Sequence, residues 1–314
     1  MIRYLSIAVA AAMALSCTEA QAREPESCQK VRFSDVGWTD ITATTATASL
    51  VLKALGYQPE TQMLSIPVTY SAMKSKDIDV YLGDWQPSME ADRKPYLDDK
   101  SIEVVGTNLT GAKYTFAVPK YVADGGVRNF ADLQKFADKF GRKIYGIEPG
   151  NNGNRMIQDI IDKGDFGLKA WDLVESSEQG MLTEVERAVR NERWIVFLGW
   201  APHPMNSRFE IEYLAGGDDY FGPNYGGAEV LTDIRAGYAQ ECPNVARLVG
   251  NLRFSVEMEN EIMGAILDNG KEPPDAALQW LRANPQTVEP WLDGVTTFDG
   301  GDAKTAVAQK LLSN

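Results

Sequence analysis

The chain has 314 residues, of which 44% are hydrophobic and 24% charged, a composition typical of a globular protein with about two domains. Its formal net charge of −13 argues against binding to nucleic acid or to an anionic membrane surface, because both need a basic face. The sequence contains one histidine, which gives little support to a metal site or to histidine-based acid–base catalysis.

Residues 1–22 have the pattern of a secretory signal peptide, which predicts a periplasmic protein. Arg3 precedes an apolar stretch over 7–15, and Ala20-Gln21-Ala22 forms a small-x-small cleavage site. The apolar stretch is too short to span a bilayer. Lipoprotein-type cleavage before Cys17 is the alternative, and Ala14 disfavours it because a large apolar residue is expected there.

Cleavage after Ala22 leaves two cysteines, Cys28 and Cys242. In an oxidising compartment, an even pair far apart in the sequence is most simply a disulfide. We therefore predict that this bond ties the start of the mature chain to a late segment.

The first part of the mature chain alternates strands with helices. The pattern predicts strands over 31–36, 78–82 and 102–105, and helices over 42–56 and 68–74, with Gly56 as a C-cap. This β-α-β-α-β order indicates a parallel sheet.

The second part repeats the alternation before the chain becomes helical. We expect strands at 114–118, 143–147, 172–175 and 194–198, helices at 130–140, 155–163 and 180–191, a further strand at 210–214, a loop over 216–227 and a strand over 228–238. The remainder to residue 312 has a helical pattern interrupted by prolines.

The predicted disulfide sets the domain organisation. If Cys28 pairs with Cys242, the chain must return to its first unit by about residue 232. We therefore predict an α/β fold with a discontinuous lobe 1, residues 23–112 plus 232–314, and an inserted lobe 2, residues 113–231. Two crossings between the lobes form a hinge, the type II architecture of a periplasmic binding protein, with parallel-rich sheets flanked by helices and the ligand in the interlobe cleft.

Three tryptophans follow predicted strands and lie within two residues of a glycine. They occur in Gly37-Trp38-Thr39-Asp40, Leu82-Gly83-Asp84-Trp85-Gln86-Pro87 and Gly199-Trp200-Ala201-Pro202. Open α/β sheets bind ligands outside the carboxyl ends of their strands. The repeated context therefore predicts a cage of indole rings, and three separate core tryptophans are the alternative.

These motifs, together with Tyr114 and Gly150-Asn151-Asn152-Gly153-Asn154, resemble the solute-binding proteins of glycine betaine/choline ABC importers. The resemblance covers essentially the whole mature chain and rests on the order and spacing of the motifs. It implies two lobes that close on a quaternary ammonium ion and deliver it to a permease, without catalysis and without a cofactor. It also implies a monomer.

The resemblance assigns the aromatic cage to Trp38, Trp85, Tyr114 and Trp200. A trimethylammonium group has no N–H to donate, so the faces of π systems must recognise it. Trp171, Trp194, Trp280 and Trp291 are interpreted as structural.

Two polar positions complete the implied site. Asp40 would offset the charge of the cation and accept the choline hydroxyl, while its alternative role is N-cap of the following helix, in competition with Thr39 or Thr42. Asn151 would bind the polar end of the ligand, and Asn152 is the alternative to it.

The remaining candidates are assigned less specific roles. His203 lies between two prolines and is expected on a loop surface, although in betaine-binding relatives a histidine near this position can meet the substrate carboxylate. The acidic pairs Asp77/Asp79 and Asp218/Asp219 lack the spacing of a calcium loop and are expected in solvated turns.

Choline is the predicted ligand, because Asp40 would repel the carboxylate of glycine betaine or proline betaine, the rival ligands. A choline-ester hydrolase is disfavoured because the sequence has no Gly-x-Ser-x-Gly motif and only one histidine. A sensor or chemoreceptor subunit with the same fold remains open at this stage.

Overall fold

The computed structural model describes residues 23–313. The predicted signal peptide, residues 1–22, and Cys17 within it lie outside the described residues. Within the described part of the chain, no helix combines the length and the apolar character that a membrane span requires.

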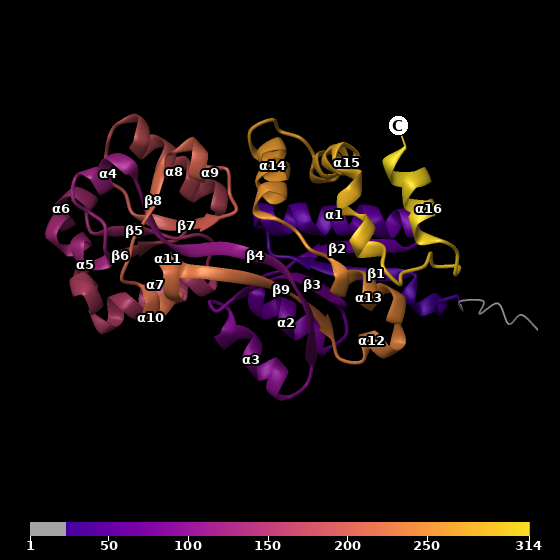
Figure 1. Ribbon diagram of the computed structural model, residues 1–314. Helices are drawn as coiled ribbons and strands as arrows, with labels where there is room; N and C mark the ends of the chain where they lie inside the picture. Colours follow the sequence, from indigo (N-terminus) through magenta and orange to yellow (C-terminus); the bar gives the residue numbers. More distant parts are fainter. Residues whose placement is uncertain (1–22, 314) are drawn as a thin grey trace, which may run out of the picture.

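Nine strands in the described residues form one continuous sheet, in the order β2-β1-β3-β9-β4-β7-β5-β6, with β8 also paired to β4 (Figure 1). The strands are β1 (Lys30–Asp35), β2 (Gln58–Met63), β3 (Val80–Gln86), β4 (Ile102–Pro119), β5 (Lys143–Tyr145), β6 (Asp172–Val174), β7 (Phe197–Ala201), β8 (Ile211–Tyr213) and β9 (Gly227–Arg235).

The helices gather around the two ends of this sheet (Figure 1). Lobe 1, with β1 to β3, carries α1 (Thr39–Leu55), α2 (Ile66–Lys74), α3 (Glu90–Asp98), α12 (Tyr238–Glu241), α13 (Pro243–Asn251), α14 (Val256–Leu267), α15 (Pro273–Ala283) and α16 (Ala303–Val307). Lobe 2, with β5 to β8, carries α4 (Lys120–Asp124), α5 (Phe130–Leu133), α6 (Ala137–Phe140), α7 (Asn152–Lys163), α8 (Glu178–Arg190), α9 (Met205–Arg208), α10 (Asp218–Phe221) and α11 (Pro223–Gly226).

The pairing directions confirm the two-lobed α/β class. In lobe 1, β1 pairs in parallel with β2 and β3, and in lobe 2, β5 pairs in parallel with β6 and β7. Between the lobes, β9 and β4 form a long antiparallel ladder that continues into β3 on one side and β7 on the other. The two strands that connect the lobes are therefore also the strands that join their sheets.

The structure changes several details of the predicted elements. The strands expected at 102–105 and 114–118 are the two ends of β4, whose pairing with β9 shifts register three times between them. The predicted lobe boundaries at 112/113 and 231/232 fall inside β4 and β9, and the residue limits of the lobes stay a prediction. Strand β2 was not expected, because a largely exposed edge strand with Pro59 has no alternating apolar pattern.

Helix α1 contributes most directly to the interlobe region. Its buried residues Ile41, Ala48 and Leu52 recur at helical spacing, which keeps one face against the core. The predicted C-cap is confirmed: Gly56 has φ 97° and donates its N–H to carbonyls of the last turn. The helix begins at Thr39 rather than at residue 42, so its first turn lies where the lobes meet.

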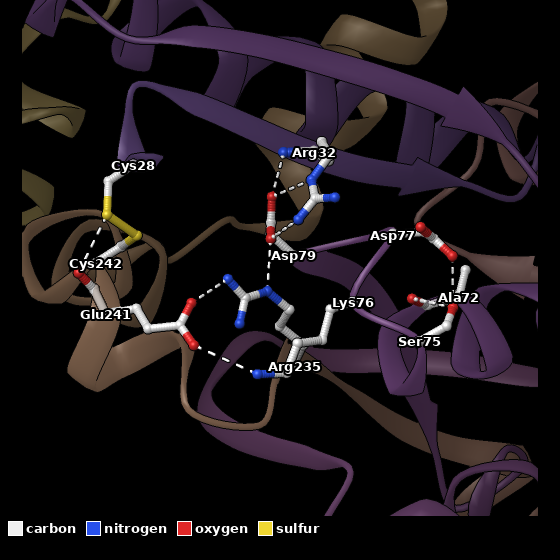
Figure 2. A network of polar contacts seen from close by, with 10 residues as sticks. All are labelled: Cys28, Arg32, Ala72, Ser75, Lys76, Asp77, Asp79, Arg235, Glu241 and Cys242. Atoms are coloured by element: carbon white, nitrogen blue, oxygen red, sulfur yellow. Dashed lines mark hydrogen bonds and ion pairs between the residues drawn. A yellow bond between two sulfur atoms is a disulfide. The ribbon is translucent and has the colours of Figure 1, made fainter. Parts of the chain in front are cut away.

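The predicted disulfide between Cys28 and Cys242 is confirmed, with the two Cα atoms 5.5 Å apart. Figure 2 shows the charged network beside it. Buried Asp79 accepts hydrogen bonds from Arg32 (2.6 Å) and Arg235 (2.7 Å), and Arg235 also donates to Glu241 (2.6 Å). The bond and the paired charges together fasten the end of β9 to β1, where the chain returns to lobe 1.

Candidate ligand-binding site

A small cavity lies between the two lobes. Its empty volume is about 290 Å³, which includes open space at its edge. Its lining combines residues from both lobes, namely Trp38, Asp40, Trp85, Ser88, Tyr114, Ile147, Asn152 and Trp200. The structure therefore brings together all four aromatic residues of the predicted cage and Asp40.

The sheet places two of these aromatic rings side by side. Tyr114 in β4 is directly opposite Trp200 in the antiparallel β4–β7 ladder, and paired residues in such a ladder project to the same face. Trp85 is the penultimate residue of β3, and its ring centroid lies 6.2 Å from that of Tyr114. Trp38 joins them from the N-cap position of α1. All four rings are buried, with exposed fractions of 4 to 7%.

Asp40 is the second residue of α1 and is 1% exposed. Its Oδ2 accepts a hydrogen bond from Trp85 Nε1 (3.1 Å), and its Oδ1 has no partner within the described residues. Burial, with the nearby charge of Glu178 as the second cause, raises the pKa of Asp40 to about 8. The cavity therefore holds a carboxyl oxygen that a cation or a hydrogen-bond donor would satisfy.

The alternative role of Asp40 as helix N-cap is wrong. Trp38 occupies the N-cap position, and Thr39 is the first helical residue. Thr42, the third candidate, lies inside the helix and donates its hydroxyl to Asp35 (2.7 Å). The sequence contains three capping side chains in four residues, and local spacing alone did not identify the helix start.

The two asparagines at the start of α7 have different surroundings. Asn151 is the N-cap of α7: its Oδ1 accepts from Gly153 N (2.7 Å) and Tyr114 OH (2.9 Å), and its Nδ2 donates to Glu148 (2.9 Å). Asn152 lines the cavity, and neither polar atom of its buried amide has a partner within residues 23–313. The cavity lining thus contains Asn152 in place of the predicted Asn151, which holds the Tyr114 hydroxyl.

Gly153 explains how Tyr114 reaches Asn151. A Cβ atom at this position would lie 2.0 Å from the Tyr114 hydroxyl, closer than any real contact. The glycine in the Asn-Asn-Gly-Asn motif therefore leaves the space that the tyrosine fills.

Two carboxylates behind the cavity were missed by sequence reasoning. Glu148 Oε1 accepts from the indole N–H of Trp38 (2.9 Å), and burial raises the pKa of Glu148. Glu178, which is 3% exposed, accepts from the backbone N–H of Thr39 (2.9 Å) and from its hydroxyl (2.6 Å). Both contacts join residues more than 100 positions apart, so no local pattern indicated them.

The expected surface role of His203 is wrong. The side chain is buried, its ring packs edge-on against Trp200 at 4.9 Å, and its Nε2 lies 3.2 Å from Glu178 Oε1. Nδ1 accepts the N–H of Met205 (3.0 Å), so in the neutral ring the proton is on Nε2 and points to Glu178. The segment after β7 therefore packs its histidine against Trp200, and the prolines on either side of His203 gave no indication of this burial.

The cavity favours binding of a cation over chemistry. Among the described residues that line it, Asp40 is the one acidic side chain and none is basic, and the rest are mainly aromatic or apolar. In the described part of the chain, no group of three or more His, Cys, Asp or Glu side chains could hold a metal ion. Aromatic faces around one carboxylate attract a desolvated positive charge.

Comparison with known proteins places the chain in a family. Residues 29–283 match the model of the OpuAC family, described as the substrate binding domain of ABC-type glycine betaine transport systems. The chain belongs to this family. Its members are substrate-binding components of transporters rather than enzymes.

Three relatives indicate the range of this family. A solved ABC-transporter choline binding protein in complex with choline is 60% identical, with a TM-score of 0.90, over 92% of this chain and 100% of that chain. Lactococcal OpuAC in its closed form with glycine betaine is 28% identical, with a TM-score of 0.76, over 83% of this chain and 98% of that chain. The glycine betaine/carnitine transport binding protein GbuC of Listeria monocytogenes is 31% identical over 162 residues, 51% of this chain and 52% of that protein.

Proposed function

We propose that this family member is a periplasmic solute-binding protein that captures choline and delivers it to the permease of an ABC importer. The observation that carries the proposal is the aromatic cavity in which Asp40 has a free carboxylate oxygen. The trimethylammonium group would contact the faces of the four rings, each desolvated contact being worth up to about 2 kcal/mol. The similarity to a choline binding protein over nearly the whole chain supports this ligand.

The charges around the cavity favour choline over glycine betaine. Asp40 lines the cavity, Glu148 holds Trp38 of its wall from behind, and Glu178 holds Thr39, which lies between Trp38 and Asp40 in the chain. A betaine carboxylate would meet this negative potential, whereas the choline hydroxyl can donate to Asp40 Oδ1. The unpartnered amide of Asn152 provides a second contact for the hydroxyl.

The same proposal covers the rest of the predicted organisation. Lobe 1 consists of residues 23–112 plus 232–314 and lobe 2 of residues 113–231, with β4 and β9 as the hinge. The chain is exported by its signal peptide and acts as a monomer. The lobes and the hinge rest on the two connecting strands, export rests on the pattern of residues 1–22, and the monomer rests on the resemblance to the family.

Calorimetric titration of residues 23–314 with choline, glycine betaine and acetylcholine tests the ligand. Choline should bind more tightly than glycine betaine. A clear preference for glycine betaine would reverse the assignment, and binding of none of the three would contradict the proposed function.

Two matched variants decide which asparagine meets the ligand. Asn152→Ala should weaken choline binding by removing a direct contact. Asn151→Ala should act through Tyr114, whose hydroxyl it holds, and Tyr114→Phe should then reproduce part of its effect. If Asn151→Ala weakens choline binding while Tyr114→Phe and Asn152→Ala do not, Asn151 is itself the ligand residue.

A further inference from the structure

The first turn of α1 receives its cap from the other lobe. A helix begins with backbone N–H groups that have no partner inside the helix. The N-cap residue of α1, Trp38, makes no capping hydrogen bond with its side chain within the described chain. Instead Glu178, at the start of α8 in lobe 2, accepts the N–H of Thr39 (2.9 Å) and the Thr39 hydroxyl (2.6 Å).

Both residues of this contact are buried, and one of them, Glu178, is a carboxylate. Thr39 is 7% exposed and Glu178 is 3% exposed. Hydrogen bonds to a carboxylate are stronger than neutral ones, and the positive end of the helix dipole adds to them. A carboxylate that stayed buried after losing these donors would be costly, so separation of the two residues must return Glu178 to water.

Glu148 of lobe 2 also accepts a hydrogen bond across the lobes, from Trp38 Nε1 of lobe 1 (2.9 Å), and two ion pairs join the lobes as well. Arg155 pairs with Asp92, and Arg208 lies 3.9 Å from Asp268, but both arginines are about half exposed. Exposed ion pairs contribute little to stability. The Glu178 contact is therefore stronger than these ion pairs, and unlike the Glu148 contact it involves no ring of the predicted cage.

Glu178 is connected to both walls of the cavity, in each case through one residue. On the lobe 1 side, Thr39 stands between Trp38 and Asp40 in the chain. On the lobe 2 side, the His203 ring that faces Glu178 packs against Trp200. Its position thus depends on the same two surfaces that enclose the ligand.

We infer that Glu178 is the latch of the closed state: its carboxylate caps α1 when the lobes are shut and, through Thr39 and His203, positions the cavity walls. This inference rests on the proposed function, because a latch requires a ligand that closes the lobes. Glu178 does not line the cavity, so it is a positioning residue. A contact made after the ligand is enclosed slows ligand release and leaves the association rate nearly unchanged.

Three variants separate the latch from a charge effect. Thr39→Val removes the hydroxyl donor without changing any charge, and Glu178→Gln removes the charge of the acceptor. Glu184→Gln is the matched control: it makes the same change in the same helix, and Glu184 pairs only with Arg187 and Arg193 of lobe 2 among the described residues. Stopped-flow tryptophan fluorescence measures choline association and release for each variant.

Release should accelerate about tenfold or more in Thr39→Val and in Glu178→Gln, with association changed less than about twofold. The control should release choline at the rate of the unmodified protein. Because both variants weaken the same contact, the double variant should release choline more slowly than independent effects would predict. Without ligand, both variants should unfold at the same temperature as the unmodified protein. Choline should raise the unfolding temperature of the variants less than it raises that of the unmodified protein.

The outcomes distinguish the latch from the proposed ligand. If the unmodified protein binds choline and neither variant changes its release, the latch is refuted. An equal drop in the unfolding temperature with and without choline would make the contact purely structural and would also refute it. If the protein binds glycine betaine instead, the choline proposal fails and the same release measurement on betaine decides the latch. Binding of neither ligand would overturn both.

Discussion

Replacement of Asp40 by asparagine tests the electrostatic basis of the proposed ligand preference. The substitution removes the one acidic group in the described cavity lining and keeps the shape of the side chain. Its carbonyl oxygen can still accept the indole N–H of Trp85, which holds the residue now. The aromatic walls should therefore stay in place, and the change in affinity should report the charge.

The expected size follows from the burial of the site. A cation about 5 Å from the carboxylate, at an effective dielectric constant of about 20, gains roughly 3 kcal/mol from the charge, or about a hundredfold in affinity. Above about pH 8, where Asp40 is ionised before the ligand binds, choline should lose most of this in Asp40→Asn. Glycine betaine carries no net charge and is relieved of repulsion at its carboxylate, so its affinity should stay constant or rise.

Titration calorimetry with both ligands measures this reversal. Asp98→Asn is the control for net charge, because Asp98 is exposed on α3 and paired with Lys94. The reasoning is refuted if Asp40→Asn leaves the ratio of choline to betaine affinity unchanged. A lower unfolding temperature of the ligand-free variant, with equal losses for both ligands, would instead make Asp40 a structural residue.

Three further outcomes are expected. Trp85→Ala and Trp200→Ala should each weaken choline binding about thirtyfold, because each removes one cation–π face worth about 2 kcal/mol. Calorimetry of each single variant measures the affinity, and a loss of less than about threefold would contradict this prediction. Replacement of Cys28 and Cys242 by serine should lower the free energy of unfolding in urea by about 5 kcal/mol, because the bond closes a loop with a sequence separation of 214. Choline affinity should rise as the pH increases toward about 8, the pKa to which burial raises Asp40. Below this pKa the carboxyl group of the empty closed site is mainly protonated, and the preference for the protonated form is lost as the pH rises through the pKa. The cation binds the ionised form, so its affinity increases over the same range. A pH series on Asp40→Asn should be flat over the same window, and a flat series for the unmodified protein would contradict the assignment.

The sequence by itself determined the features that depend on near neighbours in the chain. Strand, glycine and tryptophan in succession identified Trp85 and Trp200, because a strand fixes where its last side chains project. The disulfide between Cys28 and Cys242 is long-range, yet it followed from the count of cysteines in a chain predicted to be exported, and it led to the prediction of a discontinuous first lobe. Helical spacing and Gly56 identified α1 and its end.

The tertiary structure decided what depends on how the lobes meet. Nothing near Glu178 in the sequence indicates that it caps a helix 139 positions earlier, since the partner is a backbone N–H that every residue has. His203 was misplaced because the burial of a loop depends on what packs over it. Asn151 and Asn152 share the same motif, and only the position of the Tyr114 hydroxyl separates the residue that supports the wall from the one that faces the cavity. Long-range hydrogen bonds and burial are properties of the folded chain as a whole, and local propensity does not contain them.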